Sequence, residues 1–274
     1  MKNILITGGT SGIGLNAAKR LSRDPKNNLI IVGSKNSKGN LALKELQINS
    51  KNASFLKCDL SSLNEIKEFV TINKLPKLDV LINNAGAVFF KKKFSKENIE
   101  KTFALNHLGY FLLTNLLIKQ NLIKKGGEII NVASGAHWGV ELNFKDLQMK
   151  SNYNGWIAYK KSKLCNILFT KKLSQLLKKQ NISVNCLHPG FVETQFGSNN
   201  NCFISLGIKI AMRFGVINID KGTQTLLYLL ERNLQVTGEY FYKNKISPSS
   251  NFSLSKINAD KLWDESLKIV SDYL

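Results

Sequence analysis

The stretch "KNILITGGTSGIG", residues 2–14, decides the fold, because in it a short apolar run passes directly into a glycine-rich turn. The run is typical of a buried strand, and residues 12–23 carry the apolar spacing of a helix. Glycines at such a turn let a pyrophosphate approach the helix N-terminus, whose free N–H groups attract anions. A plain strand–helix turn is the simpler interpretation, but the spacing Gly8-x-x-x-Gly12-x-Gly14 at the first turn favours a dinucleotide site. We expect its contacts from Gly8, Thr10, Ser11, Gly12, Ile13 and Gly14.

Apolar runs and amphipathic stretches alternate along the rest of the chain. Five runs resemble the first strand, "NLIIVGS", "ASFLKC", "LDVLINN", "GEIINVAS" and "ISVNCLH", and a last strand is expected at "GEYFY". Helical patterns lie near residues 12–23, 39–49, 62–73, 96–120, 154–180 and 259–272. Strands that alternate with helices and lack polar alternation indicate a parallel sheet covered on both faces. The sequence therefore predicts an α/β fold, a Rossmann-type doubly wound sheet of about seven mainly parallel strands, as a single domain over residues 1–274.

The end of the second strand distinguishes between two dinucleotides. An NAD site usually places an Asp or Glu about 20 residues after the glycines, where it binds the ribose 2′-hydroxyl. Here no acid lies between Asp24 and Glu45, and Ser34 and Lys35 hold the position instead. A hydroxyl and an ammonium suit the 2′-phosphate of NADP(H) and leave the hydroxyl of NAD(H) without an acceptor. The sequence therefore favours NADP(H), with NAD(H) as the alternative.

The chain is strongly basic, with a net charge of +20, but its lysines are spread along all 274 residues. No nucleic-acid-binding module is recognisable, so we expect no nucleic-acid partner. The first apolar run is too short for a signal peptide, and no run reaches the ~18 uncharged apolar residues that a membrane helix needs. Four widely spaced Cys, with no C-x-x-C pair and no His at metal-ligand spacing, indicate free thiols and no metal site. These features together predict a cytoplasmic protein.

A second motif, "YKKSK", places Tyr159 one helical turn before Lys163. In a chain with 7 Tyr and 35 Lys, about one Tyr-x-x-x-Lys match is expected by chance. The motif gains meaning from the segments that surround it in order: "CDL" at 58–60, "NNAG" at 83–86, "LNHLGYFLLT" at 105–114, "NVASGAH" at 131–137 and "HPG" at 188–190. Together with the glycine turn, this series resembles the short-chain dehydrogenase/reductase family, in its single-domain type, over nearly the whole chain. "NHLGYFLLTNLL", "AYKKSKLCNILFTKKLS" and "TGEYFY" resemble in particular the retinol dehydrogenase-like group.

The resemblance implies which residues bind the cofactor and which react. Besides the glycine turn, Ser34 and Lys35, the implied cofactor-binding residues are Asp59, Leu60, Asn84, Ala85, Gly86, Tyr159, Lys163, Pro189, Gly190, Val192 and Thr194. The implied catalytic residues are Asn106, Ser134, Tyr159 and Lys163.

The resemblance also implies a separate role for each of the four catalytic residues. Tyr159 would be the general acid/base, and Lys163, together with the positive ring of the oxidised cofactor, would lower its pKa. Ser134 would hold the substrate oxygen at the ligand-binding edge of the sheet. For Asn106 two interpretations stand: a water-holding residue in a proton relay from Lys163, or a buried amide that satisfies backbone groups.

Residues of about 190–218 form the expected substrate loop. Its largely apolar part, residues 203–217, has three interpretations: a lid over a lipophilic carbonyl compound, an amphipathic helix resting on a membrane surface, or plain packing against the sheet. Trp138 and Trp156 are expected on the opposite wall.

The leading hypothesis is thus an NADP(H)-dependent oxidoreductase that interconverts an alcohol and a carbonyl group of a lipophilic small molecule. A non-catalytic dinucleotide-binding redox sensor is the alternative, although a pure binder does not need all four catalytic residues. The resemblance further implies a homodimer or homotetramer formed through the long helices that contain Asn106 and Tyr159.

Overall fold

The computed structural model describes residues 1–190, 219–232 and 236–274. Its strands are β1 (Lys2–Thr7), β2 (Asn27–Gly33), β3 (Ala53–Lys57), β4 (Leu78–Asn83), β5 (Ile123–Val132), β6 (Ser183–His188), β7 (Tyr240–Tyr242) and β8 (Lys245–Ile246). Its helices are α1 (Gly12–Leu21), α2 (Asn36–Gln47), α3 (Leu63–Ile72), α4 (Lys101–Phe103), α5 (Gly109–Lys119), α6 (Gly155–Leu177), α8 (Ile219–Arg232), α9 (Asn251–Leu254) and α10 (Lys256–Val270). A π-helical turn, Ala104–Leu108, joins α4 to α5.

The described strands form one sheet in the order β3-β2-β1-β4-β5-β6-β7-β8. Neighbouring strands are parallel, except that β7 and β8 are antiparallel. The predicted doubly wound parallel sheet is therefore confirmed, with β8 as an additional short strand. β8 follows a tight turn in which Lys243 and Asn244 both have positive φ, 50° and 60°, as a two-residue hairpin turn requires.

The strand order reverses beside β1, which has β2 on one side and β4 on the other. At such a switch point the loops that follow the two central strands diverge and leave a crevice outside the carboxyl ends of the strands. The glycine turn follows Thr7 at the end of β1, and "NAG" follows Asn83 at the end of β4. Both motifs therefore open into the same crevice.

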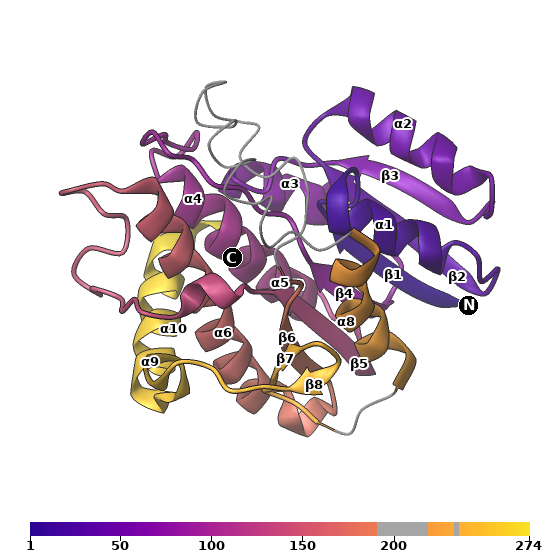
Figure 1. The fold of residues 1–274 in the computed structure, drawn as a ribbon. Helices are drawn as coiled ribbons and strands as arrows, with labels where there is room; N and C mark the ends of the chain where they lie inside the picture. Colours follow the sequence, from indigo (N-terminus) through magenta and orange to yellow (C-terminus); the bar gives the residue numbers. More distant parts are fainter. Residues whose placement is uncertain (191–218, 233–235) are drawn as a thin grey trace.

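Helices cover both faces of the sheet (Figure 1). On one face α1, α2 and α8 contribute Ala17, Leu46 and Leu226 to a core cluster with Ile4 and Ile31. On the other face, α3, α5 and α6 form a second and larger cluster. Helix α8 lies beside α1 in a stretch for which the sequence analysis predicted no element.

The helix expected at residues 96–120 begins later than predicted and is interrupted. Phe94 and Glu100 form an isolated antiparallel bridge that closes a turn, so the chain before Lys101 is not helical. The Glu100 carboxylate accepts hydrogen bonds of 2.8 Å from the N–H groups of Thr102 and Phe103 and so caps the helix start. The π-helical turn that follows contains Asn106, and such turns are frequent at functional sites.

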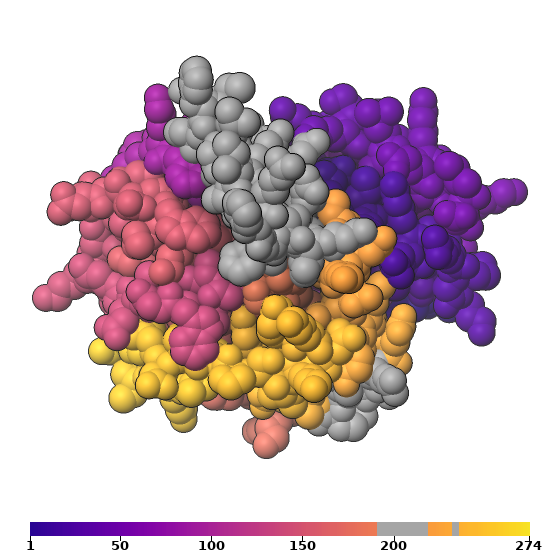
Figure 2. All heavy atoms as spheres, viewed as in Figure 1, coloured from indigo at the N-terminus to yellow at the C-terminus, as the bar shows by residue number. Residues whose placement is uncertain are grey.

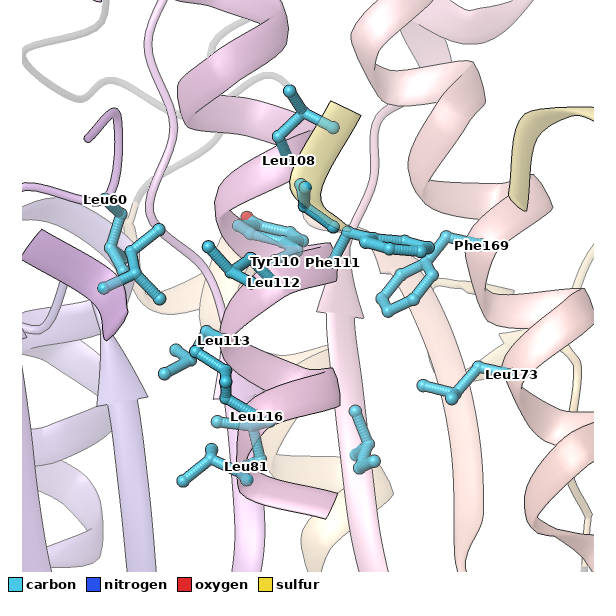
Figure 3. Close-up of a cluster of buried hydrophobic side chains, with 14 of the residues drawn as sticks. Leu60, Leu81, Leu108, Tyr110, Phe111, Leu112, Leu113, Leu116, Phe169 and Leu173 are labelled. Atoms are coloured by element: carbon cyan, nitrogen blue, oxygen red, sulfur yellow. The ribbon is translucent and has the colours of Figure 1, made fainter. Parts of the chain in front are cut away.

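Helix α5 is buried within its own chain. Eight of its 11 residues are buried, and its Phe111 ring lies 4.8 Å from Trp263 of α10 and 5.5 Å from Phe169 of α6, centroid to centroid. The apolar side chains of α5 point towards the sheet and α6 (Figure 3). Helix α10 runs beside α6 (Figure 1), and the C-terminal segment, in yellow, forms one edge of the molecule (Figure 2). Helix α10 of the same chain therefore packs through Trp263 against part of the apolar surface of α5.

The histidines make the fold sensitive to acid. His107 is fully buried and its Nε2 lies 2.8 Å from the Ser266 hydroxyl of α10, and burial lowers its pKa to about 3. Burial also lowers the pKa of His188 to about 4, with a contribution from His137. An unfolded histidine titrates near 6.5. Above that pH these imidazoles are neutral in both the folded and the unfolded chain. Below it the imidazoles of the unfolded chain take up protons, whereas those of the folded chain stay neutral.

We therefore expect the free energy of unfolding to fall as the pH drops from 7 to 5, by about 2 kcal/mol for each of these two histidines. Urea unfolding at the two pH values measures the change. His107→Asn should remove about half of this pH dependence, whereas Lys160→Gln, at a surface position, should leave it intact. An unchanged slope in His107→Asn would contradict the assignment of the buried neutral imidazole.

Candidate active site

The glycine turn has the close contacts that a phosphate cradle needs. Gly8 and Gly12 have positive φ, 64° and 55°, which side chains disfavour. A Cβ on Gly14 would lie 2.4 Å from the Gly8 carbonyl oxygen, so that position admits only glycine without a shift. The Asn84 amide donates to the Thr7 carbonyl at 2.9 Å and ties the turn to the end of β4. Helix α1 has no side-chain cap and no acid in its first turn, which leaves its N-terminus suited to an anion.

A cleft of about 610 Å³ lies over this turn, at the switch point of the sheet. It runs from the end of β2, past the turn, to the start of α6. Most of the residues predicted from sequence line it: Gly8, Thr10, Ser11, Gly12, Ile13, Ser34, Lys35, Asp59, Leu60, Asn84, Ala85, Gly86, Ser134, Tyr159, Lys163, Pro189 and Gly190. Gly14 lies under the turn and Asn106 behind the cleft wall. Val192, Thr194 and the expected substrate loop from residue 191 lie outside the described residues.

Ser134 and Tyr159 meet at one end of the cleft. The Ser134 oxygen accepts a 3.1 Å hydrogen bond from the Ala136 N–H, which fixes the side chain just after β5. Burial raises the pKa of the Tyr159 hydroxyl to about 12, and a hydrogen bond with the Ser134 hydroxyl opposes this rise. Tyr159 therefore holds its proton at neutral pH, which is the state required to donate a proton to a carbonyl oxygen.

Lys163 lies on the same face of α6 as Tyr159, one turn further along. Its ammonium group donates a 2.9 Å hydrogen bond to the Val132 carbonyl and lies 5.8 Å from the centre of the Tyr159 ring. Burial lowers its pKa to about 7. In the chain by itself, burial thus dominates the pKa of Tyr159, and the expected lowering requires the charge of the bound oxidised cofactor in addition to Lys163.

The Asn106 side chain connects the loop after β4 to α6. Its oxygen accepts from the Ala87 N–H, and its nitrogen donates to the Ala87 carbonyl and to the Ser162 hydroxyl, each at 2.9 Å. The side chain is fully buried. This geometry fits the structural interpretation of the amide, so a relay through Asn106 would have to use its backbone.

Buried amides also steady the sheet beneath the cleft. Asn83 of β4 donates to the side-chain oxygens of Asn131 in β5, at 2.9 Å, and Thr114 in α5, at 3.0 Å. Asn131 in turn donates to Thr170 of α6 at 2.9 Å. This chain of hydrogen bonds joins β4, β5, α5 and α6, the elements that carry most of the site.

At the other end of the cleft, Ser34 and Lys35 lie exposed just after β2. Lys38, one helical turn further, lines the cleft as well, and the first turn of α2 contains no acid. The Asp59 carboxylate, at the next strand end, accepts from the backbone and hydroxyl of Ser61 at 2.9 and 2.7 Å. This end is therefore basic and suited to a phosphate.

Several cleft residues were missed from the sequence: Lys38, Ser61, Phe89, Lys93, Lys101 and Leu105. Lys38 had a signal in its spacing, because it lies one helical turn after Lys35. Ser61 lies in the loop after β3, and the remaining four are placed by the loop after β4 and by the broken helix start, which the sequence pattern did not show. Of the two tryptophans expected on the wall, Trp156 lines the cleft and Trp138 does not.

Within residues 1–190, 219–232 and 236–274, no cluster of three or more His, Cys, Asp or Glu side chains has an arrangement suited to a metal ion. None of the helices in the same part of the chain has the length and hydropathy to cross a membrane.

The chain is similar to known proteins over nearly its full length. A family model described as short chain dehydrogenase matches residues 2–203. The chain is 36% identical to "Short-chain dehydrogenase TIC 32 A, chloroplastic" of Brassica napus, covering 97% of this chain and 88% of that protein. It is 33% identical to human retinol dehydrogenase 13, covering 98% of this chain and 84% of that protein. The expected likeness to the retinol dehydrogenase-like group is thus confirmed.

The fold is also found in a solved structure, a putative uncharacterized protein from Mycobacterium paratuberculosis. The two structures superpose with a TM-score of 0.81, and they share 26% sequence identity. The match covers 99% of this chain and 94% of the other. The same arrangement of sheet and helices therefore occurs in an independently determined structure.

Proposed function

Because the chain belongs to the short-chain dehydrogenase family, we propose that it uses NADP(H) to interconvert an alcohol and a carbonyl group of a lipophilic small molecule. That it is an oxidoreductase acting on alcohol and carbonyl groups follows from the family. The cofactor preference and the nature of the substrate are the parts proposed here. The human relative that is named a retinol dehydrogenase supports the lipophilic substrate, since retinol is a lipophilic alcohol.

One observation carries the proposal: the hydrogen-bonded Tyr159 and Ser134 lie in the same cleft as the glycine turn, with Lys163 one turn along the helix. A substrate oxygen placed between the two hydroxyls would accept a hydrogen bond from each. Tyr159, with its pKa of about 12, would release its proton to that oxygen as negative charge develops there. Ser134, fixed by Ala136, would stabilise the same charge.

Lys163 would act on Tyr159 at a distance. Its ammonium group is held by the Val132 carbonyl, so its place beside the Tyr159 ring is set by β5. A positive charge there stabilises tyrosinate after the proton has left. A nearby anion or a hydrogen-bond acceptor on a ligand would also favour the charged form of Lys163 itself, whose pKa of about 7 leaves it half-protonated at neutral pH.

Two parts of the cleft support the proposal of NADP(H). A Cβ on Gly8 would lie 2.8 Å from the Ala85 Cα and one on Gly14 would lie 2.4 Å from the Gly8 carbonyl oxygen, so the tight turn needs glycine at both positions. Lys35 and Lys38 line the end of the cleft where we propose that the 2′-phosphate binds. When bound, the cofactor supplies or accepts the hydride at its nicotinamide ring. The chain's own contribution is to orient the substrate oxygen, to hold the transferable proton on Tyr159 and to limit the access of water.

We expect a lower KM for NADPH than for NADH, because the basic end of the cleft interacts favourably with a 2′-phosphate. Lys35→Ala and Lys38→Ala should each raise the KM for NADPH by about tenfold and change the KM for NADH by less than twofold. Lys44→Ala, at an exposed position on α2 that does not line the cleft, is the matched control. A lower KM for NADH in the unmodified protein would contradict the proposal and favour an NAD-preferring dehydrogenase.

The substrate class is best approached through NADPH oxidation with retinal, long-chain aldehydes, steroids and quinones. Turnover of at least one of these carbonyl compounds is expected. Tight NADPH binding without turnover of any of them would favour the alternative, a redox sensor.

The expectations about membrane contact, oligomeric state and cellular location are also proposals. Residues 203–217 would form either a peripheral contact with a membrane surface or a substrate lid. Salt-dependent binding to vesicles is expected for the membrane contact and not for the lid. A homodimer or homotetramer would form through the helices that contain Asn106 and Tyr159, and light scattering measures the mass of the assembly. A cytoplasmic location agrees with the sequence pattern described above.

A further inference from the structure

Trp156 holds a position in the cleft that the mechanism above does not use. The chain has only three tryptophans. Trp263 packs in the core against Phe111, and Trp138 lies outside the cleft lining. Trp156 lines the cleft, and its side chain stays 40% exposed although tryptophan is a residue that folding usually buries to a large extent.

The Trp156 ring stacks on the ring of Tyr159. The two ring centroids are 5.4 Å apart and the ring planes differ by 20°. This is the offset stacked arrangement that aromatic pairs prefer. One face of the indole is thus taken up by Tyr159, and Trp156 lines the same cleft as Tyr159 and Ser134.

The start of α6 holds Trp156 rigidly in this place. The Asn154 side-chain oxygen accepts hydrogen bonds of 3.0 Å from the N–H groups of Trp156 and Ile157, which caps the helix. A Cβ on Gly155 would lie 2.3 Å from the Phe89 carbonyl oxygen, so the helix start touches the loop after β4. The Tyr153 hydroxyl donates to the same carbonyl at 2.6 Å. The backbone that carries the indole is therefore fixed from both sides of the cleft.

We propose that Trp156 is a specificity-determining residue, whose indole ring forms the wall against which the group attached to the substrate carbonyl lies. This inference rests on the proposed function and adds a preference to it: carbonyl compounds in which that group is planar and conjugated. A planar group can stack on the indole while the carbonyl oxygen reaches Tyr159 and Ser134. Stacking adds to the free energy gained from burial alone, whereas a flexible saturated group gains burial only.

The alternative role for Trp156 is support of Tyr159. A purely supporting ring would affect all substrates alike, because it would act through the position or the pKa of the Tyr159 hydroxyl. A substrate-contacting ring would affect planar and saturated substrates differently. The two roles are therefore separated by the ratio of two kcat/KM values rather than by either value alone.

The test compares cinnamaldehyde with 3-phenylpropanal, which differ only in the double bond that makes the first compound planar. The ratio of the kcat/KM values for the two aldehydes also depends on their intrinsic reactivity. This contribution is the same for every variant, so it cancels when the ratio of a variant is compared with that of the unmodified protein. Trp156→Leu should lower the cinnamaldehyde to 3-phenylpropanal ratio by about three- to tenfold, mainly through the KM for cinnamaldehyde. Trp156→Phe should keep most of the ratio, since it preserves an aromatic face.

Trp138→Leu is the matched control and should leave the ratio unchanged. The proposal is overturned if Trp156→Leu lowers kcat/KM for both aldehydes equally or shifts the pH profile of kcat without changing the ratio. It is also overturned if Trp138→Leu has the same effect as Trp156→Leu. Failure of the proposed function would look different, because then the unmodified protein would oxidise NADPH with neither aldehyde nor any other carbonyl compound.

Discussion

Tyr159→Phe is expected to lower kcat/KM for carbonyl reduction by about 10²- to 10⁴-fold, the range found when a general acid is removed. Phenylalanine keeps the ring that stacks on Trp156 but removes the proton that the substrate oxygen would receive. It also removes the hydroxyl that pairs with Ser134. NADPH oxidation with an accepted carbonyl compound measures the loss of activity.

Cofactor binding should survive the same change. The glycine turn and the basic end of the cleft are independent of the Tyr159 hydroxyl, so the Kd for NADPH, from fluorescence titration, should change by less than about threefold. Tyr273→Phe, in the C-terminal turn and outside the cleft lining, is the matched control and should keep full activity. Retention of more than a tenth of the activity in Tyr159→Phe would refute the assignment of the general acid.

Phe111→Ala is expected to have the largest effect on stability, a loss of about 3–5 kcal/mol in the free energy of unfolding. The Phe111 ring is fully buried and contacts rings from three elements: His107, Phe169 and Trp263. Figure 3 shows it between α5 and α6, where a smaller side chain would leave a cavity. Because Trp263 belongs to α10, the change should also loosen the contact between the C-terminal helix and the rest of the molecule.

Urea unfolding measures the loss in Phe111→Ala. Phe94→Ala offers a matched control, because Phe94 is 51% exposed and its removal should cost less than about 1 kcal/mol. A cost below about 1 kcal/mol for Phe111→Ala would contradict the packing of α10 on α5. The measurement therefore tests the contact between Phe111 of α5 and Trp263 of α10.

The sheet was predictable because its strands are buried on both faces. Runs such as "ILIT" and "LIIVG" have no polar alternation, which is the pattern of a parallel strand covered by helices. β8 was not predictable in this way, because its two residues form a strand only through pairing with Phe241 and Tyr242. Helix α8 was missed as well, since its buried leucines, Leu226, Leu227, Leu229 and Leu230, form too short a pattern to stand out.

The site residues were predictable by type and order, but their environment was not. The spacing of Tyr159 and Lys163 predicts a shared helix face, and the structure places both on it. The spacing does not show that the Lys163 ammonium would be held by the Val132 carbonyl, because that contact depends on how α6 packs on β5. Nor does it show that burial would raise the pKa of Tyr159, since burial is a property of the folded chain.

The subunit interface stays a prediction for a related reason. "LGYFLLTNLLI" is apolar enough to predict burial, and α5 is indeed buried. An apolar pattern does not say what covers it, and in the structure Trp263 of α10 in the same chain contacts Phe111 of α5. From the sequence, Trp156 could be predicted only as a candidate residue of the cleft wall. Its stacking on Tyr159 could not be predicted, because it depends on the geometry of the helix start.

The most direct test of the central claim follows the hydride itself. NADPH that carries deuterium at both C4 positions of the nicotinamide is incubated with the protein and a carbonyl compound found active in the screen, and the alcohol product is analysed by mass spectrometry. The account predicts a product one mass unit heavier, with deuterium on the former carbonyl carbon, formed by the unmodified protein and not by Tyr159→Phe. An alcohol that lacks deuterium, or equal labelling with Tyr159→Phe, would contradict it.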